Sequence, residues 1–130
     1  MRLYPPAWGQ PREAIADDEI NGFAIPAKGM VTVNQWVTHR HPDFWDEPEK
    51  FQPERFLPGH PERPKFAYFP FGGGPRVCIG NAFAMLEGPL VLATIIQKFR
   101  VELVPGHLVV PDPTFTLRPR YGVQVRLSTR

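Results

Sequence analysis

The residues of this chain that are best suited to chemistry lie together in segment 71–80, which reads Phe-Gly-Gly-Gly-Pro-Arg-Val-Cys-Ile-Gly. Cys78 is the only cysteine, so its thiol has no partner for an internal disulfide and is inert, reactive or a metal ligand. Judged by residue type alone, a solitary cysteine is most often a small buried hydrophobic residue. The neighbours of Cys78 must decide between these possibilities.

Two other kinds of site are weaker interpretations of this segment. A glycine-rich loop before a helix can bind phosphate through its backbone N–H groups. A P-loop, however, has Lys and then Ser or Thr after its last glycine, whereas Gly80 is followed by Asn81 and Ala82. Zinc is disfavoured because there is no second cysteine and the four histidines lie far from Cys78 in the sequence.

The surroundings of Cys78 favour ligation of a planar metal cofactor. Gly72 and the two glycines after it have no side chains, so the backbone can approach a flat ring closely. Residues 79–82 are expected to begin a helix, whose free N–H groups and positive dipole end favour a thiolate. Arg76 could pair with a carboxylate at the edge of the ring, and Phe71 would keep water from the sulfur.

The pattern F-G-x-G-x-R-x-C-x-G, from Phe71 to Gly80, is similar to the haem-binding loop of the cytochromes P450, the haem-thiolate monooxygenases. The resemblance implies that the cofactor is haem b and that Cys78 is the axial ligand of its iron. It also implies that further residues contact the cofactor, namely Arg12, Phe71, Gly72, Arg76 and Gly80.

Other segments agree with this resemblance in their order along the chain. Met1–Pro6 resembles the end of the family's K helix, with Arg2 as the arginine of its E-x-x-R motif. Arg12 matches the arginine that contacts a haem propionate. Residues 53–56 read P-E-R-F, as in the family's segment of that name, and 82–100 resembles its L helix. The resemblance covers essentially the whole chain.

The resemblance also implies that much of the enzyme lies outside this sequence. The Glu of E-x-x-R would precede Met1, so Arg2 and Arg55 lack the carboxylate of the family's buried charge network. The central helix that activates oxygen and most of the substrate pocket have no counterpart here. The expected fold is therefore α+β, mainly α with small β-sheets. It is the C-terminal, proximal part of a P450 domain over residues 1–130, and the rest of that domain is its partner.

The implied activity is insertion of one oxygen atom from O2 into a small organic substrate. Electrons would come from a reductase or a ferredoxin that docks on the Cys78 side, and the chain by itself is expected to be inactive. Two alternatives stay open. One is a haem-thiolate isomerase or dehydratase, although the insertion that some of these carry in the cysteine loop is not seen here. The other is a non-catalytic haem-binding or interaction remnant.

Composition limits the remaining classes of function. The net charge of +2 gives no case for binding nucleic acid, and 42% hydrophobic residues are too many for a disordered chain. No targeting segment follows Met1, and the most apolar run, 88–96, is too short to span a bilayer. An unpaired cysteine favours a cytoplasmic location, and the sequence leaves open a membrane anchor before Met1.

Proline and polar turn residues divide the N-terminal half into short elements. We expect a helix end at 1–3, then a hairpin over 12–25 that turns at Asn21 and Gly22, and then a strand at 29–33. A short helix capped by Asn34 is expected to run to about His39. It is followed by a helical turn at 47–51 and an extended run at 66–71. We interpret His39, Arg40 and His41 as a solvated or locally paired cluster, and Trp8, Trp36 and Trp45 as packing residues.

The C-terminal half has the clearest periodicity. Residues 79–100 predict a helix that is apolar on most of its surface and therefore buried on most sides. Gly88 and Pro89 in its middle are expected to bend it. Segments 115–118 and 123–126 alternate apolar and polar residues, which predicts a C-terminal hairpin with a turn between them.

Overall fold

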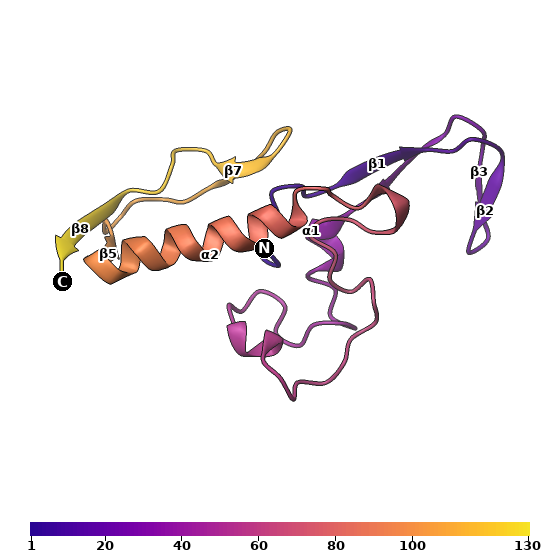
Figure 1. Ribbon diagram of the computed structural model, residues 1–130. Coiled ribbons are helices and arrows are strands. Elements are labelled where there is room, and N and C mark those ends of the chain that lie inside the picture. Colours follow the sequence, from indigo (N-terminus) through magenta and orange to yellow (C-terminus); the bar gives the residue numbers. More distant parts are fainter. The chain divides into compact units, whose positions relative to one another are not determined.

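The computed structural model describes every residue, 1–130, and separates the chain into two compact units, Met1–Pro70 and Phe71–Arg130. Figure 1 shows the first unit from indigo to magenta and the second from rose through orange to yellow. The secondary structure consists of two α-helices, two short 3-10 helices and eight strands in two-stranded antiparallel sheets.

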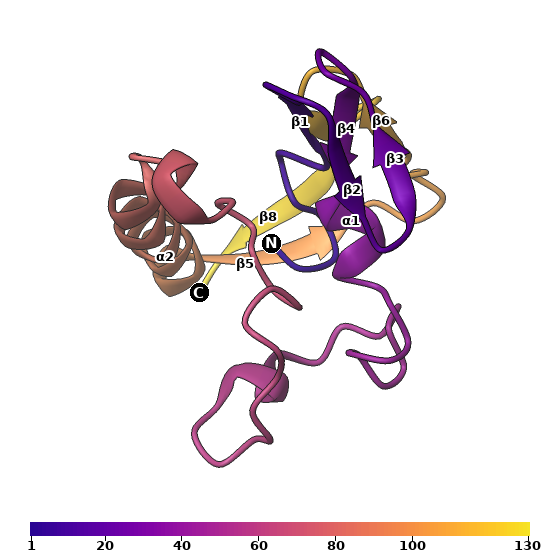
Figure 2. The same cartoon turned by 90° about the vertical axis from the view of Figure 1, so that its right-hand side faces the viewer.

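The first unit begins with two small sheets, which are visible from the side in Figure 2. Strand β1 (Gln10–Glu13) pairs with β4 (Met30–Val33). Between them in the sequence, β2 (Asp18–Ile20) pairs with β3 (Phe23–Ile25). All four strands are short, and most of their residues are exposed.

The predicted turn is confirmed, but the hairpin around it is shorter than expected. Asn21 and Gly22 have φ values of 53° and 85°, the left-handed conformation that this pair accepts in tight hairpins. Arg12 lies outside the hairpin, opposite Val31 in the β1–β4 sheet. The ladder is interrupted between the two sheets because Pro26 has no N–H to donate.

Helix α1 (Gln35–Thr38) forms where the sequence predicts it. The Asn34 side chain accepts a hydrogen bond from the Val37 N–H at 3.1 Å and so caps the helix N-terminus. His39 is the C-cap residue. The helix is only one turn long, so packing rather than intrinsic propensity must hold it in place.

Three local expectations in this unit are wrong. Residues 1–3 form no helix, because an α-helical N–H bonds four residues back and these residues have no preceding turn in the chain. Residues 47–51 form a hydrogen-bonded turn from Lys50 N to Glu47 O, and the 3-10 helix η1 (Pro53–Phe56) follows instead. Segment 66–71 is not extended throughout, because it begins in a turn in which the Ala67 N–H donates to the Pro64 carbonyl at 2.8 Å.

An aromatic cluster orders the irregular part of the first unit. Trp45, Ala67 and Phe69 form its buried apolar core, as expected for Trp45 as a packing residue. The Trp45 Nε1–H donates to the Ala67 carbonyl at 3.2 Å. The Phe56 and Tyr68 rings lie 5.0 Å apart, and Phe56 lies 6.0 Å from Trp45. Ring packing thus replaces regular secondary structure here.

The second unit is dominated by α2 (Asn81–Lys98), which begins after Gly80 and is slightly shorter than predicted. Pro89 lies inside the helix and removes one backbone donor from it. The expectation that this helix is buried on most sides is wrong for this chain, because none of its residues is buried. Large apolar side chains stand exposed along it: Phe83, Met85, Leu86, Leu90, Val91, Leu92, Ile95 and Ile96.

The strands after α2 pair differently from the prediction. Strand β5 (Phe99–Leu103) follows the helix at once and pairs with β8 (Val125–Thr129), beside which it lies in Figure 1. Strand β6 (Pro111–Pro113) pairs with β7 (Leu117–Pro119). The predicted pairing of 115–118 with 123–126 is therefore wrong. Alternation locates strands, but it does not identify their partners.

These elements give a chain of α+β type, with one long helix and small antiparallel sheets. It is not mainly α, since eight short strands accompany only two α-helices. Neither helix is long and apolar enough to cross a membrane.

Candidate functional site

The cysteine loop is closed by its own backbone. The Cys78 N–H donates to the Phe71 carbonyl at 2.9 Å, and between them Gly74–Arg76 form the 3-10 helix η2. Gly72 and Gly74 have φ values of 74° and 67°, which residues with a β-carbon rarely adopt. The loop therefore holds Cys78 in a defined position just before α2.

The Cys78 thiol is exposed and forms no disulfide. A β-carbon built at Gly80 would lie 3.7 Å from Sγ, so a large side chain at this position would cover the sulfur. Val77 and Ile79, on either side of Cys78, expose their apolar side chains as well. An open sulfur among apolar neighbours suits a flat apolar ligand and differs from the inert buried cysteine that residue type alone suggests.

The start of α2 adds hydrogen-bond donors beside the sulfur. Gly80 is the N-cap residue, and no side chain caps the helix. The Asn81 N–H donates to the Cys78 carbonyl at 3.3 Å, in a turn that joins the loop to the helix. The next N–H groups, those of Ala82 and Phe83, have no partner within the helix, and the positive dipole end of α2 favours a negative charge near its start.

A metal bound at this loop would have Cys78 as a ligand but no full set of protein ligands around it. No group of three or more His, Cys, Asp or Glu side chains in the chain could hold a metal ion. Zinc and calcium sites require several such ligands. Haem iron needs only an axial ligand from the protein, because its macrocycle supplies the others. The donor set at Cys78 therefore fits haem.

The other predicted cofactor residues are divided between the two units. Arg76 is exposed in η2 and forms no ion pair with a carboxylate of the chain, and Phe71 is half-buried at the start of the loop. Gly72 and Gly80 belong to the same unit. Arg12 belongs to the first unit, where its guanidinium donates to the Pro11 carbonyl (2.8 Å) and to the Gln10 side chain (3.2 Å).

The first unit buries two arginines, Arg2 and Arg55, and neither forms a salt bridge. Each is only 5% exposed. The Arg2 guanidinium donates to three backbone carbonyls, those of His39 (2.8 Å), Pro48 (2.6 Å) and Lys50 (2.9 Å). Arg55 donates to the Glu47 carbonyl at 3.2 Å, and its Nε–H has no partner. Backbone carbonyls therefore accept from both guanidinium groups, and the Arg2 guanidinium also lies 4.9 Å from the centre of the Trp45 ring.

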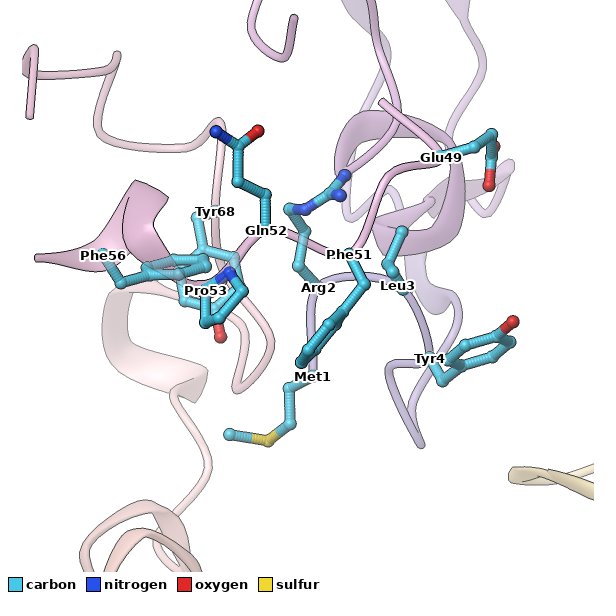
Figure 3. A pocket seen from close by; sticks show the side chains of 10 residues that line it. All are labelled: Met1, Arg2, Leu3, Tyr4, Glu49, Phe51, Gln52, Pro53, Phe56 and Tyr68. Atoms are coloured by element: carbon cyan, nitrogen blue, oxygen red, sulfur yellow. The ribbon is translucent and has the colours of Figure 1, made fainter. Parts of the chain in front are cut away.

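Burial and the neighbouring charges of Arg55 and Arg40 lower the pKa of the Arg2 guanidinium. A groove of about 630 Å³ opens beside this cluster within the first unit. Figure 3 shows Arg2 in the middle of the groove residues, with Phe56 and Tyr68 on one side and Tyr4 on the other. A buried cation without an anion is costly, so this cluster would be stabilised by a carboxylate.

His39 was expected in a solvated or locally paired cluster, and for this residue the expectation is wrong, because it is buried and its hydrogen-bond partner is thirty residues away. Its side chain is fully buried. Its Nε2 accepts the Phe69 N–H at 3.0 Å, and its ring lies 5.1 Å from that of Tyr68 and 5.2 Å from that of Phe69. The one feature of the sequence that could have indicated this burial is the spacing of four residues between Gln35 and His39, which places both on the same side of the helix. Gln35 is also fully buried.

The rest of the histidine-arginine cluster is locally paired, as expected. Arg40 forms a salt bridge of 3.0 Å with Glu49, and its guanidinium lies 3.5 Å from the Trp36 ring centre. His41 accepts a hydrogen bond from the Asp43 N–H at 3.3 Å and is partly exposed.

The buried state of His39 predicts a loss of stability in mild acid. Burial lowers its pKa to about 4, and the positive charges of Arg2 and Arg40 add to this effect. In the unfolded chain the His39 side chain is protonated below a pH of about 6.5, whereas in the folded protein it is protonated only below a pH of about 4. Stability therefore falls as the pH decreases through this window.

Urea unfolding of the full-length protein, meaning this chain together with the rest of its domain, measures the effect. Between pH 7 and pH 5 the wild type should lose about 2 kcal/mol more than the variant His39→Gln, which has no group that titrates there. Equal losses in the two proteins would contradict the assignment of a neutral, buried His39.

Comparisons with known proteins agree on one family. The family model for cytochrome P450 matches residues 1–126. Cytochrome P450 132 of Mycobacterium tuberculosis is 42% identical over 125 residues, which cover 96% of this chain and 27% of that protein. Cytochrome P450 120 of Synechocystis is 41% identical over 135 residues, which cover 99% of this chain and 30% of that protein. The chain thus spans less than a third of the length of these relatives.

Solved structures give the same result. The structure of a retinoic acid bound cyanobacterial CYP120A1 matches with a TM-score of 0.94 and 40% identity, over 99% of this chain and 31% of that one. A cytochrome P450DA heme domain matches with a TM-score of 0.91 and 29% identity. The fold of this chain is therefore part of the fold of these proteins.

Proposed function

Because this chain belongs to the cytochrome P450 family, we propose that the full-length protein is a haem-thiolate monooxygenase and that Cys78 is the axial ligand of its haem iron. The observation that carries this proposal is the exposed Cys78 thiol, held by the 2.9 Å bond from its own N–H to the Phe71 carbonyl. When bound, the haem supplies the oxygen chemistry, in which one oxygen atom from O2 enters a small organic substrate.

The residues of this chain bind and orient the cofactor in this proposal. The cysteine loop presents the sulfur, and Gly72 and Gly74 let the backbone approach the ring. Gly80 leaves the sulfur uncovered, and the first N–H groups of α2 stabilise its negative charge. Arg76 and Arg12 bind the carboxylates of the haem.

The proposal also assigns roles to the missing neighbours. The rest of the domain covers the apolar surface of α2 and supplies the substrate pocket. A glutamate before Met1 pairs with Arg2 and Arg55, whose buried charges lack a carboxylate in this chain. The electron donor, a reductase or a ferredoxin, docks on the side of Cys78.

The reaction type is tested by following the oxygen atom. The full-length protein is incubated with a ferredoxin, its reductase and isotope-labelled O2. The substrate probes are retinoic acid, the ligand named for the similar cyanobacterial structure, and a panel of apolar terpenoids and fatty acids. A product with one labelled oxygen supports the proposal. A product that forms without O2 would identify an isomerase or a dehydratase instead.

Arg76 is expected to contribute to cofactor retention. Its exposed guanidinium has no carboxylate partner in the chain and is proposed to bind a haem carboxylate. Replacing Arg76 by alanine in the full-length protein should speed haem loss about tenfold, as expected for one charge-assisted hydrogen bond. The rate is measured by transfer of haem to apomyoglobin. Arg126→Ala, which removes an exposed arginine from β8, is the control, and equal rates in both variants would refute this role for Arg76.

A further inference from the structure

Helix α1 and its C-cap bury two polar side chains that have unpartnered hydrogen-bonding atoms. Gln35 and His39 each have 0% of their surface exposed. The Gln35 amide has no partner for its Nε2 or its Oε1, and His39 has none for its Nδ1. Buried polar groups in folded proteins nearly always have a hydrogen-bond partner. Three such atoms on one turn of helix therefore indicate that a further molecule binds there.

The two side chains are neighbours on the same side of the helix. The His39 N–H donates to the Gln35 carbonyl at 2.9 Å, so α-helical geometry extends from one residue to the other. Side chains four residues apart on a helix have about 5–6 Å between their β-carbons. A single small molecule between them can therefore form hydrogen bonds to both.

The unpartnered atoms include donors and an acceptor. The Nε2 of His39 accepts the Phe69 N–H at 3.0 Å, and burial lowers the pKa of His39 to about 4. The ring is therefore neutral at pH 7, and its one proton lies on Nδ1. The Gln35 amide adds donors at Nε2 and an acceptor at Oε1. The bound molecule must accept and donate hydrogen bonds.

Ions meet this requirement poorly. An anion only accepts hydrogen bonds, so it would leave the Oε1 of Gln35 without a donor. A cation would meet the proton on the Nδ1 of His39, and the positive charges of Arg2 and Arg40 already act on this ring. The missing part of the domain is not the partner either, because this chain by itself encloses both side chains. Water both donates and accepts, and it is small enough for an enclosed site.

We propose that a buried water molecule binds between Gln35 and His39, where it accepts the Nδ1–H of His39 and bonds to the Gln35 amide. The water completes the hydrogen bonds of the tautomer in which Nε2 accepts from Phe69. It also explains why a glutamine occupies the fully buried position 35, where an apolar side chain would leave no polar atom unpartnered. This inference does not depend on haem binding.

A high-resolution crystal structure of the full-length protein tests the site directly. We expect a water oxygen within about 3.2 Å of both the Nδ1 of His39 and one atom of the Gln35 amide. The proposal is wrong if no water lies between the two side chains, or if the Gln35 amide is bonded directly to Nδ1.

The variant Gln35→Met tests whether the bridge depends on the amide. Methionine is similar in length but has no strong donor or acceptor, so the buried Nδ1–H of His39 loses its bridge. The equilibrium constant for urea unfolding at pH 7 should rise about tenfold, as expected when one buried donor loses its partner. Gln124→Met makes the same change at an exposed position of this chain and should unfold like the wild type.

Equal unfolding constants for Gln35→Met and Gln124→Met would contradict the bridge. If Gln35→Met fails to fold, the crystal structure of the wild type alone decides, since it shows whether the water is bound.

Discussion

Replacing Cys78 by alanine in the full-length protein is expected to abolish the thiolate-type Soret band of the ferrous–CO complex, together with oxygen insertion. Alanine offers no ligand atom, and this chain has no second cysteine that could supply a thiolate in its place. The loop itself should survive, because the bond that closes it uses the N–H of residue 78 and the Phe71 carbonyl rather than the thiol.

Absorption spectra of the reduced, CO-saturated variant and wild type measure this effect. Val77→Ala is the matched control, because it shortens the exposed neighbouring side chain in the same loop and leaves the sulfur in place. The control should keep the thiolate-type band. A Cys78→Ala protein that also keeps it must ligate its iron through another residue, and the assignment of Cys78 would then be wrong.

The second large effect is expected when residues 1–130 are expressed alone. This chain should be largely insoluble and should bind no haem, because α2 exposes apolar side chains along its length and none of its residues is buried. The buried charges of Arg2 and Arg55 add a cost that a carboxylate partner would reduce.

The measurement is the soluble fraction and haem content of the chain expressed alone and together with the remainder of its domain. Co-expression of the remainder is the control, because it restores the apolar and acidic partners without altering this chain. Both values should rise on co-expression. A folded, haem-loaded monomer of 1–130 alone would show that the chain needs no partner, and would favour a self-sufficient haem-binding remnant.

Local features of the fold could be predicted from the sequence, because local physics determines them. The Asn21-Gly22 turn needs a left-handed backbone, which this pair accepts. The Asn34 cap needs only a side-chain oxygen at the start of a helix. The cysteine loop is specified by glycines at positions of positive φ.

Features that depend on distant partners could not be predicted in this way. β8 alternates apolar and polar residues, but its pairing with β5 joins segments that are far apart in the sequence. The burial of His39 depends on rings from 68–69, a segment whose path no local pattern specifies. The predicted helix end at 1–3 failed because a helix requires preceding residues that this chain lacks.

The central claim is that the Cys78 sulfur binds haem iron, and X-ray absorption at the iron edge of the purified full-length protein tests it most directly. We predict one haem per protein and one sulfur atom bound to the iron in the wild type, with that sulfur absent in Cys78→Ala. A wild-type protein that contains no iron, or whose iron has only nitrogen and oxygen ligands, would contradict the claim.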